Sequence, residues 1–273
     1  MLRAEEERGW WLVTHPDHAH LAGAFAAKWG NELFSAPEPR EHVLRGVYAH
    51  DDGWRARDAE PVITEEGKPA AFSRELVGRY SAFEEIDLTA YLAVRREAVQ
   101  LMAKQDPYAA ILISMHTHNL LSERADRSTI REEDLVWLDA FLVEQMTLQR
   151  ALREQLIEEG RLDAELLVPE ELRRHFQLLQ ACDNLSLLSC VDFAGDATLL
   201  HPFVTMDGKT TEITVRRAGE RSFRLTPYPF AEPDLKFMLP ARYVEGLTFG
   251  SSEELREKLE GAETREIEVS VTG

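Results

Sequence analysis

Five polar residues interrupt runs of apolar residues that have helical spacing, in four separate segments of the chain. They are His18, His50, Asp51, His116 and Asp183. A buried carboxylate is costly unless it is paired, protonated or bound to a metal. Hydrogen bonding alone would need a separate solution for each of the five side chains, whereas one shared divalent cation would satisfy them all. The pattern therefore predicts a divalent-metal site.

Asp183 is the most informative of these residues. The segment around it places Phe176, Leu179, Leu187 and Cys190 on one face of a helix, and Asp183 lies in the centre of that face. The other residues extend similar faces. His18 continues the face of Leu21, Phe25 and Trp29; His50 and Asp51 continue that of Val43 and Val47; His116 continues that of Ala109, Leu112 and Leu120. Helical bundles hold metals through such inward-facing side chains.

The His50–Asp51 doublet can approach one ion from two directions, because neighbours on a helix lie about 100° apart. The alternative is a solvated helix end, with the histidine near the last carbonyls. Asp52 is the competing ligand if the helix register is off by one position. His118 is a second alternative, although two residues after His116 it faces elsewhere. His15, His20 and His42 fall off the apolar faces and are expected to be solvated.

Arg55 and Arg57 follow the doublet and could hold an anionic group at the metal, although each taken alone resembles an ordinary surface arginine. Residues 55–80 carry prolines and glycines with weak periodicity, which predicts a long ordered loop that acts as a lid with anion contacts. If the five residues share an ion, their ligating atoms should lie within about 4.5 Å of one another. Mixed nitrogen and oxygen ligation suits Mn²⁺, Fe²⁺, Ni²⁺ or Zn²⁺.

The elements that must position these residues are mostly helices. Apolar spacing and capping signals predict helices over 14–29, 39–51, 84–104, 107–122, 131–159 and 169–191, after a short strand at 9–14. Alternating residues after 193, with one helix at 251–259, predict a small antiparallel sheet. We therefore expect a mainly α protein, with a helical domain over 1–193 and a β-rich C-terminal portion over 194–273 packed on it.

Composition limits the partners. The chain has 273 residues and a formal net charge of −18, which disfavours nucleic acid and anionic membranes. A bound cation can still reverse the potential inside one pocket and admit a small anionic substrate. The two cysteines, Cys182 and Cys190, are too far apart along a helix for a disulfide. With no signal peptide or membrane-spanning run, we expect a cytoplasmic protein; whether it forms a homo-oligomer is left open.

The order of the five residues resembles that of the HD superfamily of metal-dependent phosphohydrolases. His18 looks like the first histidine, His50–Asp51 like the doublet, His116 like an additional histidine of the two-metal members, and Asp183 like the terminal aspartate. The second additional histidine has no clear counterpart. The segments 14–23, 49–54, 113–118 and 180–187 also resemble an uncharacterised bacterial family of domain-of-unknown-function type, over nearly the whole chain.

The HD resemblance implies an HD-like helical bundle and hydrolysis of a small phosphorylated molecule. His18, His50, Asp51 and Asp183 would then be metal ligands. His116 would be a fifth ligand or a general acid or base. Arg55 is a further candidate catalytic residue, from its place after the doublet and not from the resemblance, and would hold the anionic group. The alternative hypothesis is a non-catalytic module that binds a small ligand or a protein partner on the same scaffold. In a third interpretation, the histidines and aspartates only connect the helices through hydrogen bonds.

Overall fold

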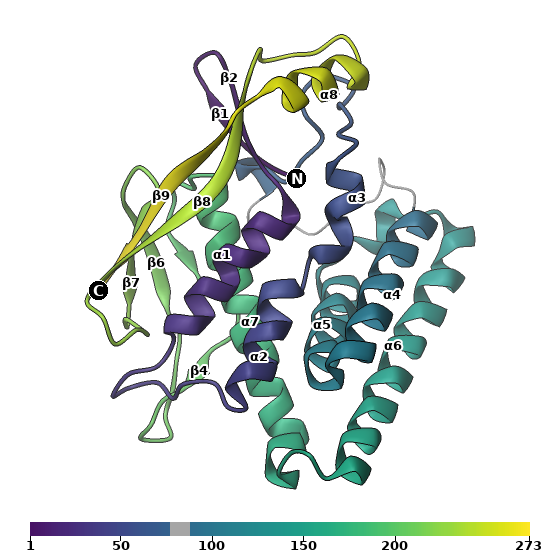
Figure 1. Ribbon diagram of the computed structural model, residues 1–273, viewed down its shortest axis with the longest axis vertical. Coiled ribbons are helices and arrows are strands. Elements are labelled where there is room, and N and C mark those ends of the chain that lie inside the picture. Colours follow the sequence, from purple (N-terminus) through teal and green to yellow (C-terminus); the bar gives the residue numbers. More distant parts are fainter. Residues whose placement is uncertain (77–87) are drawn as a thin grey trace.

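The computed structural model describes residues 1–76 and 88–273. Figure 1 shows a sheet on one side of the molecule and a group of helices on the other, with α1 and α7 between them. The helices are α1 (His15–Lys28), α2 (Arg40–Ala49), α3 (Arg55–Asp58), α4 (Leu88–Gln105), α5 (Pro107–Asn119), α6 (Glu132–Glu159), α7 (Pro169–Cys190) and α8 (Ser252–Gly261). The predicted helices are therefore confirmed within a few residues, except that positions 84–87 lie outside the described residues.

The sheet is much larger than the sequence indicated. Among the described residues, seven strands pair in the order β1-β2-β8-β9-β7-β6-β3, and β4 and β5 form a separate pair. The strands are β1 (Leu2–Glu6), β2 (Gly9–Val13), β3 (Ala197–Thr198), β4 (Phe203–Val204), β5 (Thr210–Thr211), β6 (Thr214–Gly219), β7 (Ser222–Thr226), β8 (Asp234–Glu245) and β9 (Thr264–Thr272).

The expectation of a mainly α bundle with a small C-terminal antiparallel sheet is wrong. The N-terminal hairpin β1–β2 extends the sheet through antiparallel pairing of β2 with β8, and β7 pairs with β9 in parallel, so that the sheet is mixed. Strand β1 was not predicted because Glu5 and Glu6 at its end are exposed, although Leu2 and Ala4, two positions apart, are both buried. The division at residue 193 stays a prediction, and the sheet contains strands from both sides of it.

Helix α1 is positioned by contacts with both the sheet and the other helices. Phe25 packs edge-on against Phe237 of β8, with 4.8 Å between the ring centres. The side-chain oxygen of Thr14 caps the helix by accepting a hydrogen bond from the backbone N–H of Asp17. On the opposite side, Gly23 faces the ring of Tyr48 on α2, and a Cβ built there would lie 2.3 Å from the nearest ring carbons. The absence of that side chain lets α1 and α2 approach closely.

Helix α5 is capped at its N-terminus by Asp106, which is almost completely buried. Its carboxylate accepts hydrogen bonds from the backbone N–H groups of Tyr108 and Ala109, at 3.1 Å each. The other carboxylate oxygen contacts His42 at 2.8 Å and Arg45 at 3.0 Å, both on α2. This cap therefore fixes the start of α5 relative to α2, the two elements that carry His116 and His50.

Both cysteines are free and buried, as the helical spacing predicted. Burial raises the pKa of the Cys182 and Cys190 thiols, so that both remain protonated. None of the helices in the described part of the chain combines the length and the apolar character needed to cross a bilayer.

Candidate metal centre

The five predicted residues converge between α1, α2, α5 and α7. His18 lies on α1, His116 on α5 and Asp183 on α7, while His50 ends α2 and Asp51 follows it. Their exposed fractions range from 0% for His18 to 6% for Asp51 and Asp183. His18, His50 and Asp51 form one group in which one ligand atom from each residue lies within 4.8 Å of the others, and His50, His116 and Asp183 form a second. The 4.8 Å limit is slightly wider than the expected value of about 4.5 Å, and each group holds three of the five residues, with His50 common to both.

The imidazole Nε2 atoms of two histidines face the two carboxylates. His18 Nε2 lies 3.2 Å from Asp51 Oδ2 and 3.7 Å from Asp183 Oδ1. His50 Nε2 lies 3.3 Å from Asp183 Oδ1 but has no hydrogen bond of proper geometry. These contacts join the apolar faces of three separate elements at one point.

The hydrogen bonds made by the two Nδ1 atoms determine which nitrogen of each neutral imidazole carries the proton and which carries the lone pair. The hydroxyl of Ser186 donates to the carbonyl of Asp183 at 2.8 Å, so the His18 Nδ1–H donates to the Ser186 oxygen at 2.7 Å. The His50 Nδ1–H donates to the carbonyl of Val47 at 2.8 Å. In the neutral rings both Nε2 atoms therefore carry lone pairs directed at carboxylate oxygens. Two acceptors in such contact need a proton or a metal ion between them.

The electrostatics show the same need for positive charge. Burial would lower the pKa of His50, but the carboxylates of Asp51 and Asp183 outweigh it and raise the pKa to about 9. Burial would raise the pKa of Asp183, but His50 and the neighbouring imidazoles hold it below its usual range. In the metal-free protein, His50 therefore supplies the cation that the carboxylates require by taking up a proton.

His116 offers a fifth donor. Its ring lies edge-on to that of His50, with 5.2 Å between centres. Its Nδ1 is buried and has no hydrogen-bond partner among the described residues. Burial lowers the pKa of His116 to about 3, so the imidazole is uncharged at neutral pH. An uncharged, unpartnered imidazole beside two carboxylates fits the donor set of a first-row transition metal.

Arg95 on α4 completes the cluster and was not identified from the sequence. Its Nη1 donates to Asp51 Oδ1 at 2.5 Å, and its guanidinium lies over the rings of Trp54 and Tyr91 at 5.1 and 5.4 Å from their centres. Burial would raise the pKa of Asp51, but Arg95 holds it well below its usual range. The signal was present, because Arg95 shares a helical face with Leu88, Tyr91, Leu92 and Val99, all of them buried.

The structure does not bring Arg55 to this cluster. Its side chain is 70% exposed and pairs with Asp52 at 3.0 Å. Asp52 and His118, the two alternative ligands, also lie outside both groups. Arg57 lies over Trp54, and Lys68 pairs with Glu66 at 3.3 Å. Residues 55–80 were expected to act as a lid with anion contacts at the cluster. Among the described positions 55–76, Arg55, Arg57 and Lys68 make these contacts with residues outside the five. Positions 77–80 lie outside the described residues.

His15 is less solvated than its position off the apolar face suggested. Its Nδ1 lies 2.9 Å from Asp58 Oδ1, and its ring stacks on Trp54 with 4.9 Å between centres. Burial lowers the pKa of His15 to about 4. The uncharged His15 imidazole and the Asp58 carboxylate border the His–Asp cluster, since the His15 and His18 rings are 6.3 Å apart.

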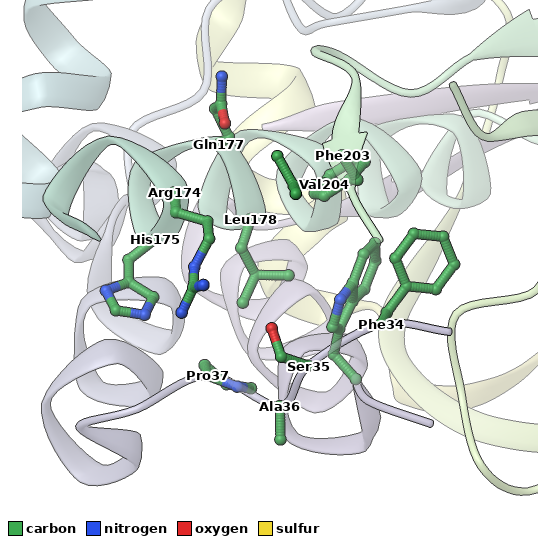
Figure 2. A pocket seen from close by; sticks show the side chains of 11 residues that line it. Phe34, Ser35, Ala36, Pro37, Arg174, His175, Gln177, Leu178, Phe203 and Val204 are labelled. Atoms are coloured by element: carbon green, nitrogen blue, oxygen red, sulfur yellow. The ribbon is translucent and has the colours of Figure 1, made fainter. Parts of the chain in front are cut away.

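A separate pocket opens elsewhere on α7, as Figure 2 shows. Arg174, His175 and Leu178 face the 34–37 segment across it, with Phe203 behind. It has a volume of about 30 Å³, which is the share of one water molecule in the liquid. None of the five clustered residues lines it. This pocket is too small for a phosphorylated metabolite. A larger one, of about 450 Å³, opens beside Arg3, Trp10 and Arg74, and none of the five clustered residues lines it either.

Comparison with known proteins places the chain in one family. Residues 1–246 match the family described as "Protein of unknown function (DUF3891)", and the chain belongs to that family. Searches of curated proteins and of solved structures gave no match. The part of the sequence-based resemblance that concerns an uncharacterised family is therefore confirmed.

Proposed function

We propose that this member of the family is a metal-dependent phosphohydrolase that acts on a small phosphorylated molecule. The observation that carries the proposal is the pair of buried Nε2 atoms, on His18 and His50, that lie 3.2 and 3.3 Å from the Asp51 and Asp183 carboxylates. The hydrogen bonds at the two Nδ1 atoms leave each Nε2 free to bind an ion. The HD-like order of the residues supports it, although the fold differs from the helical bundle that this resemblance implied.

In this proposal His18, His50, Asp51 and Asp183 hold the ion through nitrogen and oxygen atoms. Their helices are fixed by the α1–α2 contact and the Asp106 cap, which preorganises the donors. The bound metal would lower the pKa of a water molecule and polarise a phosphoryl oxygen. His116, held uncharged by burial, serves as a fifth ligand or accepts a proton.

The surface charge is compatible with an anionic substrate. Although the chain carries a net charge of −18, Arg95 and the ion supply positive charge inside the cluster. The arginine expected to act there, Arg55, is exposed instead. Arg95 therefore replaces Arg55 as the cation nearest to the proposed chemistry.

Elemental analysis tests the proposal directly. Protein purified without added metal should contain Mn, Fe, Ni or Zn, or take up Mn²⁺ or Zn²⁺ after chelation, and should hydrolyse members of a phosphomonoester and phosphodiester panel. His50→Ala should lose both properties. His20→Ala, at an exposed position on α1, is the matched control and should keep them. A folded protein that contains no metal and takes up neither ion would rule the proposal out.

A second candidate function is a non-catalytic interaction module, favoured by the outer face of α6. Val136, Trp137, Val143 and Met146 are 59 to 64% exposed there, an unusual density of large apolar side chains on one helix. A thermal-shift screen against metals and metabolites separates the two functions. Stabilisation by a metabolite together with metal-independent behaviour and no turnover of any phosphoester would favour the module.

A further inference from the structure

The oxygens of Asp51 are not equivalent. Oδ2 faces His18 Nε2 at 3.2 Å, inside the cluster, whereas Oδ1 accepts a hydrogen bond from Arg95 at 2.5 Å. Both side chains of the ion pair are less than a tenth exposed. A carboxylate that bridges two metal ions through both of its oxygens needs each oxygen free to bind one of them. With Oδ1 on the guanidinium, Asp51 has one oxygen left for a metal.

The histidines impose the same limit. The two potential metal groups share His50, so filling both at once would require two lone pairs from that ring. Its Nδ1 is committed to the carbonyl of Val47, which leaves Nε2 alone. One Nε2 lone pair binds one ion. The two groups are therefore alternative descriptions of a single centre with up to five donors.

Charge argues in the same direction. Asp51 and Asp183 contribute two negative charges, which one divalent ion neutralises, and Arg95 adds a further positive charge beside them. A second divalent ion next to a buried guanidinium would be repelled strongly, because little solvent screens the charges. The aromatic rings of Trp54 and Tyr91 hold the guanidinium in place.

We infer that the centre takes a single divalent cation, and that Arg95 is the positioning residue that occupies the Asp51 oxygen through which a second ion would be bridged. The inference rests on the proposed metal site and adds its stoichiometry and the residue that sets it. Arg95 also turns Oδ2 toward His18, so it orients a metal ligand through a hydrogen bond to its other atom.

The first test measures metal per chain by elemental analysis after loading with excess Mn²⁺ and desalting, together with the electron paramagnetic resonance spectrum. We expect one Mn²⁺ per chain and the hyperfine pattern of an isolated ion. Two ions per chain with a spin-coupled spectrum would overturn the inference and leave the proposed metal site standing. No bound metal would overturn the proposed site and this inference together.

The second test uses substitutions on α4. Arg95→Gln removes the positive charge and the guanidinium group that binds Asp51. The Mn²⁺ affinity of the folded variant should then fall about 10- to 100-fold, the usual effect of losing a group that orients a metal ligand. Arg95→Lys keeps a charged donor and should recover most of the affinity, still with one ion. The control is Arg96→Gln. The Arg96 side chain is partly exposed and pairs with Glu144 at 2.8 Å, so this variant should bind Mn²⁺ with the wild-type affinity.

Unchanged or tighter Mn²⁺ binding in folded Arg95→Gln would refute the positioning role. Should that variant fail to fold, because Asp51 loses its partner, Arg95→Lys decides alone. Two ions per chain in Arg95→Lys, or an affinity as low as that expected for Arg95→Gln, would refute the inference.

Discussion

Substitution of Asp183 by asparagine tests the metal site through stability. Asparagine keeps the shape of the side chain but removes one of the two carboxylates in the cluster. If the metal-free wild type is given Mn²⁺ at a free concentration of 100 times its Kd, binding should stabilise the fold by about 2.7 kcal/mol. The entropy of unfolding is about 2.1 cal/mol/K per residue, or roughly 0.57 kcal/mol/K for 273 residues. The wild-type Tm should therefore rise by about 5 °C.

Asp183→Asn should lose nearly all of that increase. If removing a charged ligand weakens binding about 100-fold, the same Mn²⁺ concentration only equals the new Kd, and the stabilisation falls to about 0.4 kcal/mol. The corresponding Tm change is below about 1 °C. Differential scanning calorimetry on chelator-treated protein, with and without Mn²⁺, measures both values.

Asp192→Asn is the matched control, because Asp192 is also a buried aspartate close to the end of α7 but pairs with Arg217 of β6. Its Tm should fall with or without metal, and its Mn²⁺-induced rise should stay near 5 °C, as derived for the wild type. An equal Mn²⁺-induced rise in Asp183→Asn and the wild type would refute the assignment of Asp183 as a ligand. Equal destabilisation of Asp183→Asn in both conditions, with no rise in the wild type, would instead support a cluster held only by hydrogen bonds.

Three further outcomes are expected. The pKa of His50 is raised to about 9, so a metal ion must displace a proton from its imidazole, and the Mn²⁺ affinity should rise up to about tenfold per pH unit between neutral pH and pH 9. Calorimetry in buffers of different ionisation enthalpy should detect the released proton. An Mn²⁺ affinity that does not change with pH would contradict this. Gly23→Ala should destabilise the fold by about 1–3 kcal/mol in urea unfolding, because the added Cβ would overlap the Tyr48 ring. The control is Gly46→Ala on α2, where the added Cβ would lie 3.4 Å from its nearest neighbours, and it should be neutral or stabilising. Equal effects of the two substitutions would refute the packing argument. Asp106→Ala should cost at least about 1–2 kcal/mol, measured in the same way, because two capped N–H groups and an ion pair are lost; a change below about 0.5 kcal/mol would show that the cap contributes little.

The cluster could be predicted because the buried face of a helix can be recognised from the residues of that segment alone. A period of 3.6 residues shows which face is buried, and a carboxylate such as Asp183 on that face is conspicuous in the sequence. Arg95 was harder to recognise, since long arginine stems often lie along apolar surface while the charge reaches water. Nothing adjacent to Arg95 in sequence indicates that its partner is Asp51, 44 positions earlier.

The sheet was underestimated for a different reason. Strand β2 was predicted, but its neighbour β8 begins more than two hundred positions later, and a local pattern does not specify a partner at that separation. The alternation in β1 is short and ends in acidic residues, so it resembles an exposed terminus. Strand pairing is a property of the assembled molecule, whereas the helical faces that carry His18 and Asp183 are properties of single segments.

The pairing of β2 with β8 also sets an order of events during synthesis. Val13 and Asp234 are separated by 221 positions, the difference of their numbers. At about 5–20 residues per second, the ribosome needs roughly 11–44 s to produce β8 after β2 has been made. Throughout that interval the edge of β2 lacks the strand that pairs with it, and its unpaired backbone N–H and C=O groups can pair with other chains. Asp183 is translated before β8, so every proposed metal ligand exists before the sheet can close.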